Sequence, residues 1–186
     1  MAPSDRETPE AIGVRRATPG DLAGMARVHV ESWKTTYRGI VSQSYLDALS
    51  YEGDIARGFG RWLKEPRDGW THLVAFRGTG EIVGFAIAGP NRKADPEYAG
   101  ELGAIYLLEN VQGRGVGTRL MRGVARHLVS IDLGSMLVWV VERNPYRRLY
   151  EKLGGTPVRR SVEPVAGEMH PLIAYGWKDL RGLASP

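Results

Sequence analysis

Apolar residues in the first third of the chain recur at the three-to-four-residue spacing of amphipathic helices. A weakly alternating segment at 12–16 predicts a first strand, and apolar positions along 22–34 predict the first helix. A short helix is expected at 44–49, and an amphipathic helix at 51–64 is expected to end before Pro66. Two or three helices are therefore expected to precede the main sheet.

The middle of the chain changes to runs of β-branched and aromatic residues, which predict strands. The runs at 71–77 and 81–88 flank a Gly-Thr-Gly turn and predict an antiparallel hairpin. A strand at 101–107 is followed by a helix over 116–128, in which apolar residues repeat every four positions. The apolar run at 135–141 then predicts a strand parallel to 101–107, because a helix connects the two in a right-handed βαβ unit.

The last elements are a capped helix and a closing pair of strands. Asn144 suits a helix N-cap, Pro145 the first helical position, and Gly154 the position after the helix. Strands are expected at 156–165 and 170–177. The pattern predicts an α/β (α+β) fold, in which helices flank a single mixed, mostly antiparallel sheet of about seven strands with a parallel central pair.

The composition fits one compact domain with loose ends. The chain has 186 residues, of which 42% are hydrophobic and 25% are charged, which suffices for a single core. We expect a flexible arm at 1–10, one domain over 11–180 and a C-terminal tail at 181–186. No run approaches the roughly 18 apolar residues of a membrane span, and the polar start lacks the apolar core of a signal peptide. A cytoplasmic location without membrane contact is expected.

The residue content gives no indication of a metal site or of disulfide bonds. Cysteine is absent, which excludes disulfides, a thiolate nucleophile and Cys-ligated metals. The four histidines, at positions 29, 72, 127 and 170, show no paired metal-ligand spacing. Each is expected to be a surface or hydrogen-bonded structural residue, and no metal is assigned.

The formal net charge of +4 is distributed unevenly. Residues 114–160 hold ten Arg or Lys against three Asp or Glu. No aromatic residues alternate with these arginines as a single-strand nucleic-acid surface would require, so a small polyanion explains the charge better than nucleic acid does. For Arg119, Arg122 and Arg126, a solvated helix face remains the alternative.

A glycine-rich turn connects the strand at 101–107 to the following helix. Gly113, Gly115 and Gly117 remove side chains that would cover backbone N–H groups, and the helix start adds unpaired N–H groups and a positive dipole end. A pyrophosphate fits such a turn. The Rossmann fingerprint requires a third glycine in a different register, and the P-loop requires a Gly-Lys-Ser/Thr sequence that is missing here.

Two motifs carry a resemblance to a known family. The segment Gln112-Gly113-Arg114-Gly115-Val116-Gly117 resembles the Arg/Gln-x-x-Gly-x-Gly/Ala signature of the GNAT superfamily of acetyl-CoA-dependent N-acetyltransferases. Asn144 followed by Leu149-Tyr150-Glu151-Lys152-Leu153-Gly154 resembles its second signature, Asn-x(5)-Tyr-Glu-Lys-x-Gly. The order of elements over 12–177 also resembles the family fold.

Two positions depart from the family pattern. Arg147 stands where a small residue is usual, and Gly155 replaces a common Phe. The segment 32–40 resembles the start of many family members without indicating an acceptor.

The resemblance implies acetyl-CoA as co-substrate. Backbone groups of 105–107 are expected to pair with the pantetheine amides like an added strand, and residues 112–118 to hold the pyrophosphate. Asn144 is expected to contact the pantetheine arm besides capping its helix. The residues assigned to the cofactor are Ile105, Tyr106, Leu107, Gln112, Gly113, Arg114, Gly115, Val116, Gly117, Thr118 and Asn144.

Catalysis needs a proton acceptor for the amine and a proton donor for the leaving thiolate, because an alkyl ammonium has a pKa of about 10.4. By resemblance, Glu101 is the candidate base, and a solvent-exposed residue at a strand start is the alternative. Tyr150 is the candidate acid, with pure packing as the alternative. The absence of cysteine favours direct transfer over a covalent acetyl-enzyme.

The acceptor is a primary amine whose identity stays open. Trp33, Tyr37 and the loop at 89–100 are candidates for its pocket, although aromatic residues on a helix are more often core. Small amines, polyamines, aminoglycosides and peptide amino termini are all compatible, and the resemblance makes a homodimer plausible. A non-catalytic acyl-CoA-binding regulatory module is the alternative function.

Overall fold

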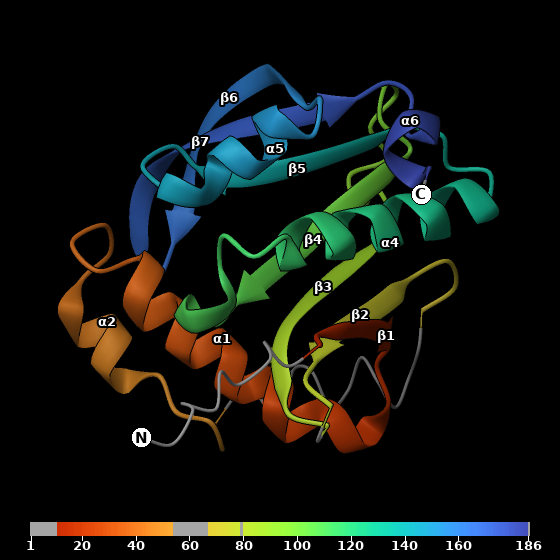
Figure 1. Ribbon diagram of the computed structural model, residues 1–186. Coiled ribbons are helices and arrows are strands. Elements are labelled where there is room, and N and C mark those ends of the chain that lie inside the picture. The colour runs from red at the N-terminus through yellow and green to blue at the C-terminus, as the bar shows by residue number, and fades with distance from the viewer. Residues whose placement is uncertain (1–10, 54–66, 79, 186) are drawn as a thin grey trace, which may run out of the picture.

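The computed structural model describes residues 11–53, 67–78 and 80–185 and contains one sheet flanked by helices (Figure 1). The N-terminal arm and most of the helix expected at 51–64 lie outside the described residues. The strands are β1 (Gly13–Arg16), β2 (Thr71–Phe76), β3 (Ile82–Pro90), β4 (Gly100–Leu107), β5 (Met136–Val141), β6 (Thr156–Val165) and β7 (Glu168–Trp177). The α-helices are α1 (Leu22–Thr36), α2 (Gln43–Ala48), α4 (Val116–Ser130), α5 (Arg148–Lys152) and α6 (Arg181–Ala184). Short 3₁₀ turns occupy Pro19–Asp21, Glu109–Val111 and Pro145–Arg147.

The sheet has seven strands in the order β1-β2-β3-β4-β5-β7-β6, and only β4 and β5 are parallel among these neighbours. This confirms the predicted mixed sheet with a parallel central pair. The β4–β5 ladder contains only the pairs Gly100–Met136 and Glu101–Leu137. Beyond them the two strands diverge (Figure 1), which opens a gap in the middle of the sheet.

Helices α4 and α1 cover opposite faces of the sheet. A Cβ on Gly123 of α4 would lie 2.7 Å from Leu73 of β2, so Leu73 faces α4. Side chains alternate between faces along a strand, and Val74 therefore points the other way. In the neighbouring strands Phe85 and Tyr106 continue the row of Val74, and the Tyr106 ring meets His29 of α1 at 4.9 Å between centroids.

Helix α4 buries the stripe that its four-residue repeat predicted. Its apolar positions Val116, Leu120, Val124 and Leu128 are each at most 1% exposed and belong to the main core. The C-terminal segment forms the short helix α6, which contributes Leu183 and Ala184 to the edge of the same core. Within the part of the chain that the structure describes, no helix is both long and apolar enough to span a bilayer.

A β-bulge interrupts β4 beside the gap. Ile87 of β3 pairs with Ala104, but the next residue, Ala88, pairs with Leu102, so Gly103 is the extra residue. A bulge increases local twist and re-aims the residues around it. The ring of Trp70 packs across this point, 3.5 Å from where a Gly103 Cβ would lie.

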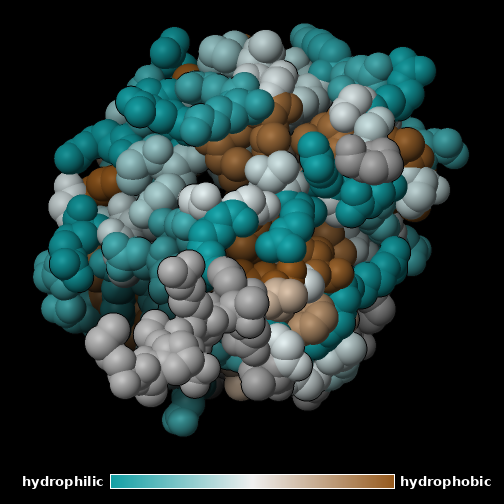
Figure 2. Space-filling model, in the orientation of Figure 1, coloured by the Kyte–Doolittle hydropathy of each residue, from teal (hydrophilic) through white to brown (hydrophobic). Residues whose placement is uncertain are grey.

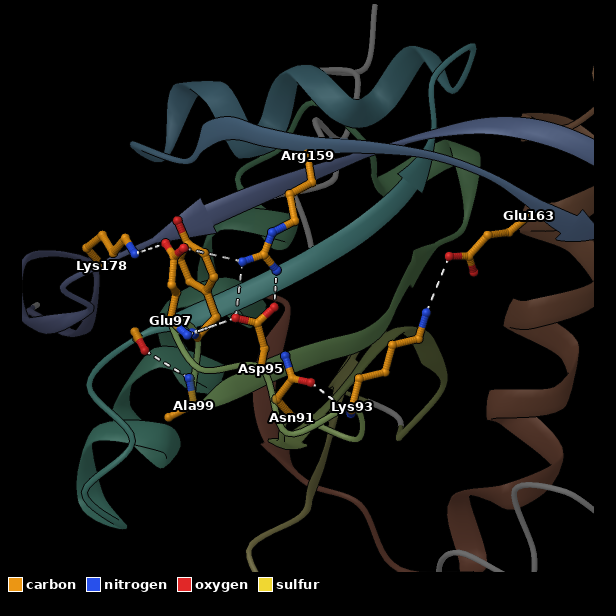
Figure 3. A network of polar contacts seen from close by, with 10 residues as sticks. Asn91, Lys93, Asp95, Glu97, Ala99, Arg159, Glu163 and Lys178 are labelled. Carbon is orange, nitrogen blue, oxygen red and sulfur yellow. Dashed lines mark hydrogen bonds and ion pairs between the residues drawn. The ribbon is translucent and has the colours of Figure 1, made fainter.

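The β3–β4 loop is tied to the opposite end of the sheet by a network of charges (Figure 3). Arg159 of β6 pairs with Asp95 and lies 3.7 Å from Glu97, which also binds Lys178. Tyr98 is 2% exposed and packs on β7, where it fills the space that a side chain at position 176 would need. The loop expected near the acceptor is therefore anchored to β6 and β7.

Candidate functional site

A cleft of about 540 Å³ lies where β4 and β5 diverge. On the face shown in Figure 2, apolar surface is exposed in the middle of the molecule with hydrophilic side chains around it. The cleft is lined by Ser32, Thr36, Tyr37, Ala104, Ile105, Tyr106, Leu107, Gln112, Gly113, Gly115, Gly117, Thr118, Val138, Val140, Asn144, Pro145, Tyr146, Arg148, Leu149, Tyr150 and Lys152. It therefore brings the two sequence motifs together.

The glycine-rich turn forms one end of the cleft as a backbone cradle. Gly113 and Gly115 have φ values of 71° and 76°, in the left-handed region that favours glycine. No atom lies within 4 Å of the position of a Cβ on either residue. Gly115 is the N-cap of α4, so the N–H groups and positive dipole end of that helix meet this space. The geometry suits an anion such as a phosphate.

Close packing holds this turn against the strand and helix beside it. A Cβ on Gly117 would lie 3.1 Å from Leu149 and 3.3 Å from Leu107, so α4 approaches β4 and α5 closely there. The Gln112 amide donates a hydrogen bond to the carbonyl of Leu107 at 3.1 Å. The first position of the motif therefore fixes the turn to the end of β4.

Asn144 connects the second motif to α1. Its Oδ1 accepts a 2.9 Å hydrogen bond from the N–H of Tyr146, which confirms the predicted N-cap. The capped turn is a 3₁₀ helix that continues into α5. The Nδ2 group donates to the Tyr37 hydroxyl at 3.3 Å, and both side chains line the cleft.

Replacing Asn144 is expected to lower stability through the lost cap. We expect Asn144→Ala to lower the free energy of unfolding by about 1 kcal/mol, which corresponds to a Tm decrease of roughly 2 to 4 °C. Asn144→Asp keeps an oxygen for the Tyr146 N–H and should recover most of the loss. Thermal unfolding of the three proteins measures this, and equal Tm values for Asn144→Ala and the wild type would contradict the capping role.

Tyr150 lines the cleft from α5 and is 7% exposed. Its ring packs against Tyr175 and Trp177, with centroids 5.7 and 6.2 Å away. Burial raises the pKa of its hydroxyl above the ordinary value, and the nearby Tyr37 and Tyr106 hydroxyls add to this. The phenol therefore keeps its proton at neutral pH.

Glu101 lies outside the cleft lining, at the last paired position of β4 and β5. Its carboxylate accepts hydrogen bonds from the backbone N–H of Arg92 at 3.1 Å and from Nε and Nη2 of the Arg92 side chain. Burial raises the pKa of the Glu101 carboxyl, but the hydrogen bonds and charge of Arg92 outweigh it, so the pKa lies below its ordinary value. The alternative of a solvent-exposed residue does not hold, because Glu101 is 8% exposed.

The other predicted residues divide between the cleft and the core. Arg114 and Val116 are not among the lining residues, and Val116 is buried in the core at 1% exposure. Tyr37 lines the cleft, whereas Trp33 stacks on Tyr37 with a centroid distance of 4.5 Å and belongs to the apolar cluster around it.

Two basic residues in the cleft were missed by sequence reasoning. Arg148 and Lys152 of α5 line it together with Tyr150. The signal was present, since both lie within the second motif, at the spacing that puts residues on one face of a helix. Their charge adds to the attraction for an anion.

A second cavity, of about 50 Å³, opens beside the first. Its described lining is Arg67, Trp70, His72, Ile87, Arg92, Gly103 and Ala104. Ala104 also lines the larger cleft, so the two spaces meet at this residue next to the β4 bulge.

Comparisons with known proteins find acetyltransferases by family model, by sequence and by structure. The model of the "Acetyltransferase (GNAT) family" matches residues 30–155. The chain is 37% identical over 172 residues to the "Uncharacterized N-acetyltransferase YuaI" of Bacillus subtilis, an alignment that covers 92% of this chain and 96% of that protein. It is 32% identical to a "Probable N-acetyltransferase" of Mycobacterium tuberculosis, with 90% and 94% covered. Its fold is similar to that of "yncA, a putative acetyltransferase" of Salmonella typhimurium, solved with acetyl-CoA, at TM-score 0.67 and 20% identity over 95% and 98% of the two chains.

Proposed function

The chain belongs to the GNAT family of acetyltransferases, and from this premise we propose that it moves an acetyl group from acetyl-CoA directly to a primary amine. The observation that carries the proposal is the cleft between β4 and β5, where a glycine cradle for phosphate and the Tyr150 side chain line one space. Both are needed by an enzyme that binds a nucleotide thioester and protonates its thiolate.

The proposed cofactor contacts are mostly made by backbone. N–H groups of 113–118 would hold the pyrophosphate, since Gly113 and Gly115 leave open space where side chains would project. The Gln112 N–H already donates to the Glu109 carbonyl at 3.2 Å, so Gln112 would contribute by fixing the turn. Arg148 and Lys152 would add positive charge. The edge of β4 at 105–107 lacks a β5 partner, so backbone groups on this edge are available to pantetheine amides, and one N–H would polarise the thioester carbonyl. The Leu107 carbonyl is the exception, because it accepts from the Gln112 amide.

Tyr150 is the proposed proton donor to the leaving thiolate. It lines the cleft, and its raised pKa keeps the hydroxyl protonated until a thiolate develops beside it. The chain contains no cysteine, which supports attack by the amine itself on the thioester rather than passage through an acyl-cysteine.

Glu101 is the proposed proton acceptor for the amine. Because it lies outside the cleft lining, it would act through a water molecule. Its pKa below the ordinary value keeps the carboxylate ionised and ready to accept a proton at neutral pH, at the cost of some basicity. Arg92 would hold the carboxylate in one orientation through its three donor groups.

Cofactor binding should appear first as a stabilisation of the fold. A ligand at about 100 times its Kd stabilises the folded state by about 2.7 kcal/mol, which should raise the Tm of a chain of this size by roughly 5 to 10 °C. We expect this with CoA and acetyl-CoA, and not with NAD or ATP at the same concentration. Release of free thiol from acetyl-CoA in the presence of a broad amine panel then measures transfer. Absence of both effects would contradict the proposed function.

A further inference from the structure

The second cavity lies on the face of the sheet opposite to α4. His72, Ile87 and Ala104 stand directly opposite one another across β2, β3 and β4, so they share a face. Each lies two positions along its strand from a residue of the row Val74, Phe85 and Tyr106. Residues two apart on a strand point to the same face, so the cavity lies on the face that α1 covers. Because Ala104 also lines the large cleft, a molecule in this cavity would reach the cleft through the gap in the sheet.

The described walls of this cavity carry two basic side chains, and the Glu101 carboxylate bound to Arg92 offsets one of their two charges. Arg67 and Arg92 line it, and none of its described lining residues is an Asp or Glu. His72 adds no charge, because burial lowers the pKa of its imidazole and keeps it neutral at neutral pH. Arg67, Arg92 and Glu101 together carry a formal charge of +1, which disfavours an acceptor that carries only ammonium groups.

Arg92 is held in place before any ligand arrives. Its guanidinium is bound through Nε and Nη2 to the buried Glu101 carboxylate and lies 5.8 Å from the ring centroid of Trp70. That ring packs against the backbone at Gly89 and Gly103, where a Cβ would lie 2.5 and 3.5 Å from it. A guanidinium fixed in this way loses little freedom when it binds an anion.

We propose that this cavity is the acceptor pocket, and that the acceptor is a small primary amine that also carries an anionic group, such as an amino acid. This inference rests on the proposed function. The anion would pair with Arg67 and Arg92, and the amine would point toward Ala104, where the cavity meets the cleft. A volume of about 50 Å³ is too small to enclose a polyamine or an aminoglycoside.

Glu101, Tyr150 and water account for every proton that moves in the acetyl transfer. The ammonium gives one proton through water to Glu101, and the amine nitrogen forms a bond to the acetyl carbonyl carbon. The carbon–sulfur bond breaks, and the thiolate takes a proton from Tyr150. The nitrogen carries a positive charge after it bonds to the carbonyl carbon, and it loses its second proton to water as the amide forms. The products are the amide, free CoA and one proton released to solvent, and the proton on Glu101 returns to Tyr150 through solvent.

Matched amines test the acceptor class. Amino acids and their decarboxylated amines, for example leucine with isoamylamine and lysine with cadaverine, are compared at equal concentration for thiol release from acetyl-CoA. We expect the carboxylate-bearing member of at least one pair to react at least about tenfold faster, because a charge-assisted pair to Arg is worth more than one factor of ten. Failure of every anion-bearing amine to react would overturn the inference.

An arginine substitution tests the pocket itself. Arg67 is exposed, so Arg67→Gln should fold normally, and we expect it to raise the KM of the best anionic acceptor about tenfold with the KM of acetyl-CoA unchanged. Arg126→Gln, on the exposed face of α4, is the matched control and should change neither value. An unchanged acceptor KM in Arg67→Gln would overturn the inference.

The proposed acceptor class and the proposed function can fail separately. If CoA stabilises the fold and only amines without an anion are acetylated, the proposed function stands and the acceptor class is wrong. If CoA neither stabilises the fold nor is released with any amine, the proposed function fails as well.

Discussion

Tyr150→Phe is expected to lower kcat about 100-fold, because it removes the proton donor to the thiolate, and general acid catalysis is worth about 10²- to 10⁴-fold. The KM for acetyl-CoA should change little. Phenylalanine keeps the ring that packs on Tyr175 and Trp177, so Tm should stay close to the wild-type value. Steady-state thiol release with one saturating acceptor, together with thermal unfolding, measures both quantities.

Tyr175→Phe is the matched control for this variant. The Tyr175 hydroxyl donates to Glu151 at 2.6 Å and accepts from Arg147 at 2.7 Å, and Tyr175 does not line the cleft. Its loss should lower stability by about 1 kcal/mol and leave kcat unchanged. If Tyr150→Phe retains full activity, Tyr150 has a packing role and another group protonates the thiolate. If neither protein transfers acetyl groups although both bind CoA, the chain acts as an acyl-CoA-binding module.

Gly115→Asp is expected to weaken acetyl-CoA binding at least about 100-fold, because a carboxylate would stand in the phosphate cradle and like charges that lose water repel strongly. Asp tolerates the left-handed backbone better than most residues, and a side chain meets no atom within 4 Å at this position. The left-handed φ of 76° should still cost a side chain at this position about 1 kcal/mol of stability relative to glycine, which is a much smaller effect than the expected loss of ligand affinity.

Gly115→Asn separates the effect of charge from that of size, because the Asn side chain has nearly the same shape as that of Asp and carries no charge. We expect it to weaken binding about tenfold or less. Both variants should bind a truncated thioester that lacks the pyrophosphate as the wild type does. Equal Kd values for acetyl-CoA in the Asp and Asn variants, measured by calorimetry, would show that no anion lies at this turn.

Local signals in the sequence predicted the elements that build the cleft. The four-residue repeat from Val116 to Leu128 predicted the buried face of α4, and the residues at 144, 145 and 154 predicted a capped helix. These signals depend on neighbours in the chain, which is why they are readable without a structure. The parallel relation of β4 and β5 followed from the helix between them.

Features set by long-range contacts were not predictable. The bulge at Gly103 depends on how β4 pairs with β3, and the partner of Glu101 is Arg92 in a loop that gave no local signal. The second cavity combines residues of three strands with Arg67 and Trp70. Arg114 was predicted near the phosphates from its place in the motif, yet only its glycine neighbours line the cleft.

The sheet has only two backbone residue pairs between β4 and β5, so its hydrogen-bonded ladder is nearly interrupted there. Four strands lie on one side of this seam and three on the other. The two halves share the main apolar core, and they are also joined by the loop that Arg159 holds and by the contact between Tyr37 and Asn144. A ligand whose amides bond to the open edge of β4 would supply rungs that the protein omits. The bound ligand would then add backbone hydrogen bonds where the sheet has none, so we expect slower amide hydrogen exchange in the free edge of β4 when CoA is bound.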